Sequence, residues 1–156
     1  MQLILHTADL SRGFMVEWLL EELGVPYRRE VVDLFSGETK SDAYRAVHPL
    51  GSVPALLVDG VPHMESLAMM LFLADAYPEA KLAPGLDHPS RSHYLQWMVY
   101  CTATLEPALG PAFVRSLSVD LDARKTIATP EERQDFHRKL APLSPSMAED
   151  SVLAMG

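Results

Sequence analysis

Residues 54–64, Pro-Ala-Leu-Leu-Val-Asp-Gly-Val-Pro-His-Met, carry the clearest fold signal in the sequence. Two apolar runs flank Asp59-Gly60, and these residue types favour the positive backbone angles of a two-residue hairpin turn. The pattern predicts an antiparallel pair of strands, Pro54 to Val58 and Val61 to Met64. An apolar helix is expected directly afterwards, over Leu67 to Ala76.

The residues before this hairpin predict a strand, a helix and a second strand. Leu3 to Leu5 has the short apolar pattern of a buried strand. Ser11 is a suitable N-cap for a helix that runs to Leu23. A second strand is expected over Arg29 to Leu34, and a short helix over Lys40 to Ala46. The order βαβ followed by ββα predicts an α/β domain with a four-stranded mixed sheet.

Strand signals end after this region. Proline, glycine and aspartate in residues 79–89 indicate a linker, and helical patterns follow over 90–105 and 112–126. Thr129-Pro130-Glu131-Glu132 is typical of a helix start, with Thr129 as the cap. The predicted organisation is a first domain over 1–78, the linker over 79–89, and a helical region over 90–156.

Composition narrows the possible functions. The chain has 156 residues and a net charge of -8, from 21 acidic and 13 basic side chains. This acidity argues against a nucleic-acid-binding surface, which needs clustered lysine and arginine. The histidines show no metal-ligand spacing, so no metal is expected.

Targeting signals are not evident. The first residues lack the basic segment of a signal peptide, and no apolar run approaches the roughly 20 residues that cross a bilayer. The one cysteine, Cys101, allows neither an intrachain disulfide nor a Cys-x-x-Cys redox pair. We therefore expect a cytoplasmic protein that is neither membrane-bound nor a thiol–disulfide oxidoreductase.

Three stretches form a larger pattern. The first is Ser11-Arg12 followed by residues 18–27, Trp-Leu-Leu-Glu-Glu-Leu-Gly-Val-Pro-Tyr. The second is residues 48–56, His-Pro-Leu-Gly-Ser-Val-Pro-Ala-Leu, which is close to Asn-Pro-x-Gly-x-Val-Pro-x-Leu. The third is residues 65–68, Glu-Ser-Leu-Ala, with Tyr77-Pro78 at the usual distance. In this order and spacing they resemble the glutathione transferase family.

The resemblance implies a thioredoxin-like first domain that binds glutathione, followed by an all-helical domain. The loop Ser52-Val53-Pro54 would carry a cis Val53–Pro54 bond, which only X-Pro adopts cheaply. The Val53 backbone would then pair with the glutathione peptide as an added strand. On the residues alone, an ordinary trans proline beginning a strand is the alternative.

The resemblance also assigns Glu65 and Ser66 to the γ-glutamyl end of glutathione. Ser66 would donate its hydroxyl and backbone N–H to the carboxylate, helped by a helix N-terminus. Glu65 would accept from the ammonium group. Simple helix capping is a second role for the same residue types, and the two roles are compatible.

The sequence leaves two candidates for the residue that activates the glutathione thiol. Members of the family use a Tyr, Ser or Cys after the first strand, but here no Tyr precedes Tyr27 and the only Cys is Cys101. Ser11 is the preferred candidate to stabilise the glutathione thiolate, and Thr7 is the alternative. Ser11 could equally act only as a helix cap. Arg12 could supply a positive field at the site or be solvated.

The sequence departs from the family pattern at two places, and two hypotheses for the function therefore remain. His48 stands where the family has Asn, and residues 90–156 are expected to form only a shortened version of the helical domain. The first hypothesis is an enzyme of detoxification type that conjugates glutathione, as co-substrate, to small hydrophobic electrophiles and forms a homodimer. The second is a non-catalytic interaction or regulatory module.

Overall fold

The computed structural model describes residues 1–110 and 129–140. The chain divides into two compact units, one from Met1 to Ala83 and one from Pro84 onward. The division falls inside residues 79–89, where the sequence predicts a linker.

The first unit is built on a four-stranded sheet in the order β2-β1-β3-β4. Its strands are β1 (Leu3–Thr7), β2 (Arg28–Val31), β3 (Ala55–Val58) and β4 (Val61–His63). β1 runs parallel to β2 and antiparallel to β3, and β3 and β4 form the hairpin. The mixed sheet and the order βαβ–ββα predicted from the sequence are therefore confirmed.

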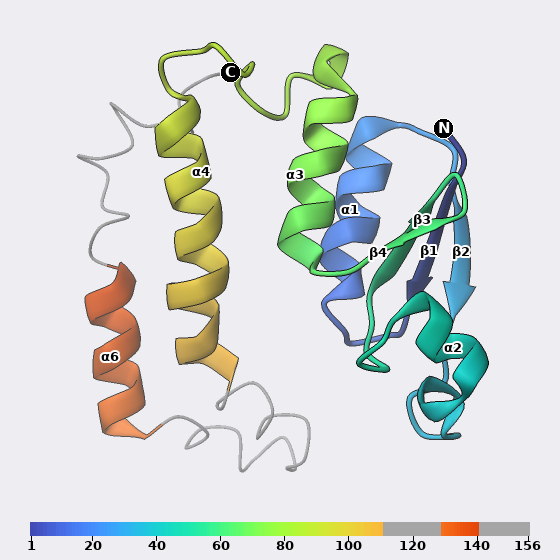
Figure 1. Ribbon diagram of the computed structural model, residues 1–156. Coiled ribbons are helices and arrows are strands. Elements are labelled where there is room, and N and C mark those ends of the chain that lie inside the picture. The colour runs from blue at the N-terminus through green and yellow to red at the C-terminus, as the bar shows by residue number, and fades with distance from the viewer. Residues whose placement is uncertain (111–128, 141–156) are drawn as a thin grey trace. The chain divides into compact units, whose positions relative to one another are not determined.

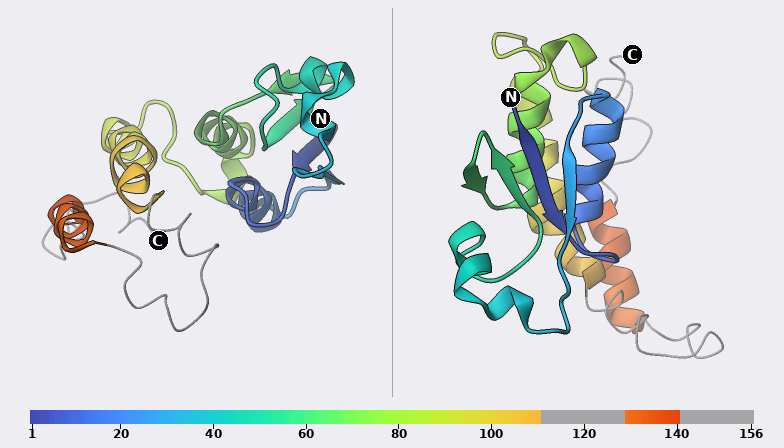
Figure 2. Two further views of the ribbon diagram at one scale, coloured as in Figure 1. Left: turned by 90° about the horizontal axis from the view of Figure 1, so that it is seen from below. Right: turned by 90° about the vertical axis from the view of Figure 1, so that its right-hand side faces the viewer.

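Helices α1 (Gly13–Leu23) and α3 (Ser66–Ala76) lie side by side on one face of this sheet (Figures 1 and 2). The core lies between them and the strands. Its fully buried members, each at 2% exposure or less, are Leu3, Leu5, Val16, Leu20, Leu56, Met69 and Leu73. Burying one such side chain stabilises the fold by about 2 kcal/mol. This layer fixes the helices to the sheet.

The segment between β2 and β3 begins earlier than expected. β2 ends at Val31, not at Leu34, because Asp33 turns the chain: its Oδ1 accepts the N–H of Phe35 at 2.8 Å and of Ser36 at 3.1 Å. A 3₁₀ turn, η1 (Glu38–Lys40), and α2 (Asp42–Val47) follow, near the end of the sheet to which β1 and β2 point (Figure 1).

The second unit is helical in the part that is described. α4 (Arg91–Tyr100) continues into a π-helical stretch, η3 (Cys101–Leu105), and α6 (Pro130–Leu140) lies beside them (Figure 1). The Tyr100 hydroxyl donates to the Lys139 carbonyl at 2.6 Å, which ties the two helices together. The helix expected over 112–126 lies outside the described residues.

The predicted start of α6 is confirmed as a capping box. The Thr129 N–H donates to Glu132 Oε2 at 2.8 Å, and the Glu132 N–H donates to Thr129 Oγ1 at 3.2 Å. Each side chain thus satisfies one backbone N–H that the first helical turn leaves free. Over residues 1–110 and 129–140, no helix has the length and apolar character needed to cross a membrane.

Candidate functional site

The strand register brings three loops to one end of the sheet. β1 and β3 are antiparallel with His6 opposite Ala55, so the end of β1 meets the start of β3. β3 and β4 are antiparallel with Leu56 opposite His63, so the end of β4 lies there too. The loops at this end contain the residues predicted to bind glutathione or activate its thiol: Ser11 and Arg12, Ser52 to Pro54, and Glu65 and Ser66. α1 and α3 both begin at this end (Figure 1).

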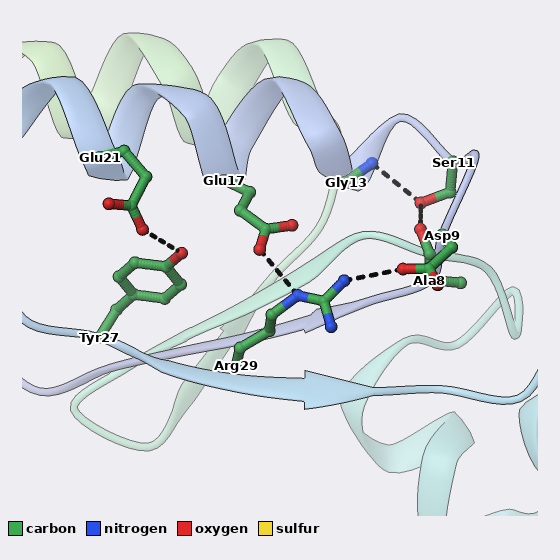
Figure 3. A network of polar contacts seen from close by, with 8 residues as sticks. All are labelled: Ala8, Asp9, Ser11, Gly13, Glu17, Glu21, Tyr27 and Arg29. Atoms are coloured by element: carbon green, nitrogen blue, oxygen red, sulfur yellow. Dashed lines mark hydrogen bonds and ion pairs between the residues drawn. The ribbon is translucent and has the colours of Figure 1, made fainter.

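Ser11 lies just before α1 but is not its N-cap. That position belongs to Arg12, which is exposed and makes no side-chain capping bond. The Ser11 hydroxyl donates to the Ala8 carbonyl at 2.6 Å and accepts the Gly13 N–H at 3.1 Å (Figure 3). The assigned cap position is therefore one residue later than expected, but the expected capping bonds are made by Ser11, whose hydroxyl accepts the Gly13 N–H and whose carbonyl accepts the Phe14 N–H. The side chain still satisfies one N–H at the helix N-terminus.

Thr7, the alternative to Ser11, lies beneath the same helix end. Its side chain is fully buried, and among the described residues its Oγ1 has no hydrogen-bond partner. A Cβ on Gly13 would come within 1.9 Å of this oxygen and 3.1 Å of Ser11 Oγ. The two hydroxyls are thus neighbours at the start of α1, and only glycine fits between them.

The loop before β3 has the geometry predicted for it. The Val53–Pro54 bond is cis, as expected. Pro54 is buried, whereas Ser52 is exposed and Val53 half-buried. The Ser52 carbonyl accepts the Tyr44 hydroxyl of α2 at 2.8 Å. Among the described residues, the Val53 N–H and C=O make no hydrogen bond with another backbone group.

Glu65 and Ser66 form the start of α3. Glu65 has a positive φ of 70° and ψ of 104°, uncommon for a residue with a side chain. Its carbonyl accepts the Met69 N–H at 3.0 Å, and its own side chain is exposed. Ser66 is the first helical residue and is 8% exposed. A helix N-terminus with a serine at its first position is suited to an anion such as a carboxylate.

An ion-pair network holds the Ser11 loop against β2 and α1 (Figure 3). The Arg29 guanidinium contacts Asp9 at 2.9 Å and Glu17 at 2.7 Å. The loop contains Leu10 with a φ of 57°, a left-handed conformation that a branched side chain seldom adopts. We infer that Arg29 restrains this unfavourable turn.

Replacing Arg29 with glutamine is expected to speed backbone amide exchange over residues 8–12. The variant loses both ion pairs, so the turn containing Leu10 opens more often. Hydrogen exchange by NMR measures this. Arg28→Gln is the matched control, because Arg28 is exposed and, within residues 1–110 and 129–140, its ion pair is with Glu30 of the same strand. Equal exchange in the two variants would contradict the restraint.

The same network borders an open groove. It has a volume of about 580 Å³, with charged walls from Arg29 and the acidic side chains of α1. Its lining also includes three exposed apolar residues: Leu10 at 77%, Phe14 at 61% and Trp18 at 58% exposure. The groove thus offers an apolar surface next to the Ser11 loop. The described residues hold no group of three or more His, Cys, Asp or Glu that could bind a metal ion.

Known proteins share both sequence and fold with this chain. Residues 13–76 match the family described as glutathione S-transferase, N-terminal domain. Residues 13–76 thus belong to the family of glutathione S-transferase N-terminal domains. Glutathione S-transferase 3 of Schizosaccharomyces pombe is 34% identical over 119 residues, 76% of this chain and 49% of that protein. Glutathione S-transferase GstA of Escherichia coli O157:H7 is 35% identical over 96 residues, 60% and 48% of the two chains.

Solved structures of glutathione transferases share the fold. The URE2P6 transferase of Phanerochaete chrysosporium, in complex with oxidized glutathione, superposes with a TM-score of 0.74 at 27% identity, over 91% of this chain and 66% of that one. URE2P8 of the same organism gives a TM-score of 0.75 at 25% identity, over 91% and 65%. The chain spans about half the length of the curated glutathione transferases that it matches.

Sequence reasoning missed two residues at this end of the sheet. Tyr44 reads as one more apolar residue of a short helix, and its contact with Ser52 needs the tertiary fold. Gly13 reads as an ordinary early helical residue, and its fit against Thr7 depends on how closely α1 approaches β1. The positions of Tyr44 and Gly13 beside the family motifs are the signal that could have drawn attention to them.

Proposed function

We propose that this chain binds glutathione at the three-loop end of its sheet and transfers the thiolate to small hydrophobic electrophiles. The observation that carries the proposal is the convergence, in a domain of this family, of two helix N-termini with the unpaired backbone of Val53. Related proteins have been solved with oxidized glutathione, which supports the choice of ligand.

Each loop has a proposed role. Val53 exchanges backbone hydrogen bonds with the peptide of glutathione, and Ser52 and Pro54 shape the loop that presents it. Ser66 and Glu65 hold the γ-glutamyl carboxylate and ammonium. These groups fix the cysteinyl sulfur near the start of α1, where the helix dipole favours an anion.

Ser11 is proposed to stabilise the thiolate, with Arg12 adding positive potential. To donate to sulfur, the Ser11 hydroxyl must exchange its bond with the Ala8 carbonyl for one with the ligand. The glutathione thiol releases its proton to solvent, and the resulting thiolate attacks the electrophilic carbon. The new C–S bond forms as a leaving group departs with its electron pair or, at an activated double bond, as the π electrons move to the neighbouring atom, which takes a proton from solvent. The apolar groove side chains Phe14 and Trp18 offer a surface for that electrophile beside the Ser11 loop.

One observation favours the second function, a non-catalytic glutathione transferase-like module. The Ser11 proton is already donated to a backbone carbonyl at 2.6 Å, so activation of the thiol needs that bond to be given up. A module of this kind would bind glutathione without lowering the thiol pKa. In either case we propose a cytoplasmic protein whose partners are glutathione and a second copy of the chain, with no metal.

Immobilised glutathione followed by a thiol-conjugation assay separates these functions. The enzyme is retained and turns over a small aromatic electrophile, whereas the module is retained without turnover. A chain that is not retained at micromolar concentration has neither function.

Replacing Ser66 with alanine is expected to raise the Kd for glutathione about tenfold or more, since a hydrogen bond to a charged carboxylate contributes about 1.5 to 3 kcal/mol. Isothermal titration calorimetry measures the change. Ser90→Ala is the control, because Ser90 is likewise a serine at the start of a helix, but at the N-cap of α4 in the second unit. An unchanged Kd in Ser66→Ala would remove Ser66 from the binding site.

A further inference from the structure

The loop that presents Val53 is fixed from α2 by one side chain. Tyr44 is 6% exposed, and its ring packs edge-on against His6 at a centroid distance of 6.0 Å. Its hydroxyl donates to the Ser52 carbonyl at 2.8 Å. Burial, with a smaller effect of the Glu38 carboxylate, raises the pKa of Tyr44 to about 12, so the hydroxyl stays protonated and remains a donor near neutral pH.

The loop is also held at its preceding residue. Gly51 has a φ of 62°, and its N–H donates to the His48 carbonyl at 2.8 Å. A Cβ at Gly51 would come within 2.4 Å of the Thr39 carbonyl oxygen, so the backbone here presses against the segment before α2. Gly51 and Tyr44 together leave the Ser52 carbonyl little freedom to turn.

The Ser52 carbonyl and the Val53 N–H belong to the same planar peptide unit. In a trans peptide these two groups point in opposite directions, so a contact that fixes one fixes the other. The Ser52–Val53 bond is trans, because Val53–Pro54 is the only cis bond found in the described residues. The bond from Tyr44 therefore directs the Val53 N–H away from α2.

We infer that Tyr44 is a positioning residue for glutathione: by holding the Ser52 carbonyl, it aims the Val53 N–H at the ligand backbone. The inference rests on the proposed function. In an antiparallel ladder, a hydrogen-bonded pair of residues exchanges both of its N–H···O bonds. Val53 would pair in this way with the central cysteine of glutathione, and its N–H would meet the cysteinyl carbonyl.

Tyr44→Phe tests this assignment, because it removes the hydroxyl and keeps the ring that packs against His6. The Kd for glutathione is expected to rise about fivefold. The pKa of the bound thiol is expected to stay at the parent value, since Tyr44 acts on the peptide and not on sulfur. Tyr77→Phe is the control: Tyr77 is another tyrosine of the first unit, partly buried against its core, and its side chain makes no hydrogen bond within the described residues.

A glutathione analogue with the cysteinyl carbonyl reduced to a methylene distinguishes loss of the Val53 N–H position from general damage to the binding site. It lacks the acceptor for the Val53 N–H, so parent and Tyr44→Phe should bind it with equal Kd. The inference would be overturned if Tyr44→Phe raised the Kd for glutathione and for the analogue by the same factor. It would also be overturned if the Kd for glutathione did not change. A parent protein that binds no glutathione would instead overturn the proposed function, and this inference with it.

A second measurement uses the protein without ligand. The Val53 amide signal in a ¹⁵N spectrum should shift and exchange faster in Tyr44→Phe, while the signals of β1 stay in place. An unshifted Val53 signal would show that the Ser52–Val53 unit keeps its direction without Tyr44, and would also overturn the assignment.

Discussion

Replacing Gly13 with alanine should destabilise the first unit by about 2 kcal/mol, although the same change in most helices is stabilising. Alanine is favoured over glycine inside a helix by about 1 kcal/mol. Here the added Cβ would lie 1.9 Å from Thr7 Oγ1 and 2.8 Å from Thr7 Cβ, and both atoms are buried. Overpacking of this kind costs about 3 kcal/mol, which outweighs the gain in helix propensity.

Urea unfolding measures the change in the free energy of unfolding. Gly85→Ala is the control, since a Cβ there meets nothing within 4 Å, and its effect should be small. Adding Thr7→Ala to Gly13→Ala should recover part of the loss, because the closer of the two contacts is with the Thr7 hydroxyl. A Gly13→Ala protein as stable as the parent would mean that α1 does not approach β1 this closely.

Ser11→Ala should raise the pKa of bound glutathione by one unit or more, which corresponds to about 1.4 kcal/mol or more of lost thiolate stabilisation. Conjugation near neutral pH should slow, and at pH values below the parent pKa the loss should approach tenfold for each unit by which the pKa rises, because less of the bound thiol is ionised. Affinity should hardly change, since Val53, Glu65 and Ser66 are proposed to hold the peptide. The measurement is the ultraviolet absorbance of the bound thiolate against pH, at saturating glutathione.

Thr7→Val is the matched control for Ser11→Ala. It replaces a buried hydroxyl that has no partner among the described residues by a methyl group of similar size. The bound thiol pKa should stay near the parent value, and stability should not fall, because an unsatisfied buried hydroxyl is itself costly. If Thr7→Val moves the pKa and Ser11→Ala does not, Thr7 is the activator. If neither does, the non-catalytic module is supported.

The sheet could be predicted from the sequence because its signals are local. Asp59-Gly60 marks the hairpin turn, and the alternation of apolar runs with helical periodicity gives the rest of the order. The capping box at Thr129 and Glu132 was predictable for the same reason, since both partners lie within one helical turn.

The contacts that shape the site could not be read in this way. Tyr44 meets Ser52 across a loop, Gly13 fits against Thr7 of another element, and the Ser11 proton goes to the Ala8 carbonyl. Each of these depends on how elements approach in three dimensions. Residue type at a motif position indicates which groups gather at the site, but not which partner each hydroxyl already has.

Pro62 in β4 limits how this protein can associate. β4 is an edge strand. In an antiparallel hairpin, successive N–H groups of a strand point alternately toward the paired strand and away from it. Of the three residues of β4, the one opposite Leu57, which is Pro62, is the one whose N–H would point away from β3. Proline at that position has no N–H, so the exposed edge lacks the donor that a neighbouring strand needs. A continuous intermolecular sheet cannot grow from this side, which protects the fold from edge-to-edge aggregation.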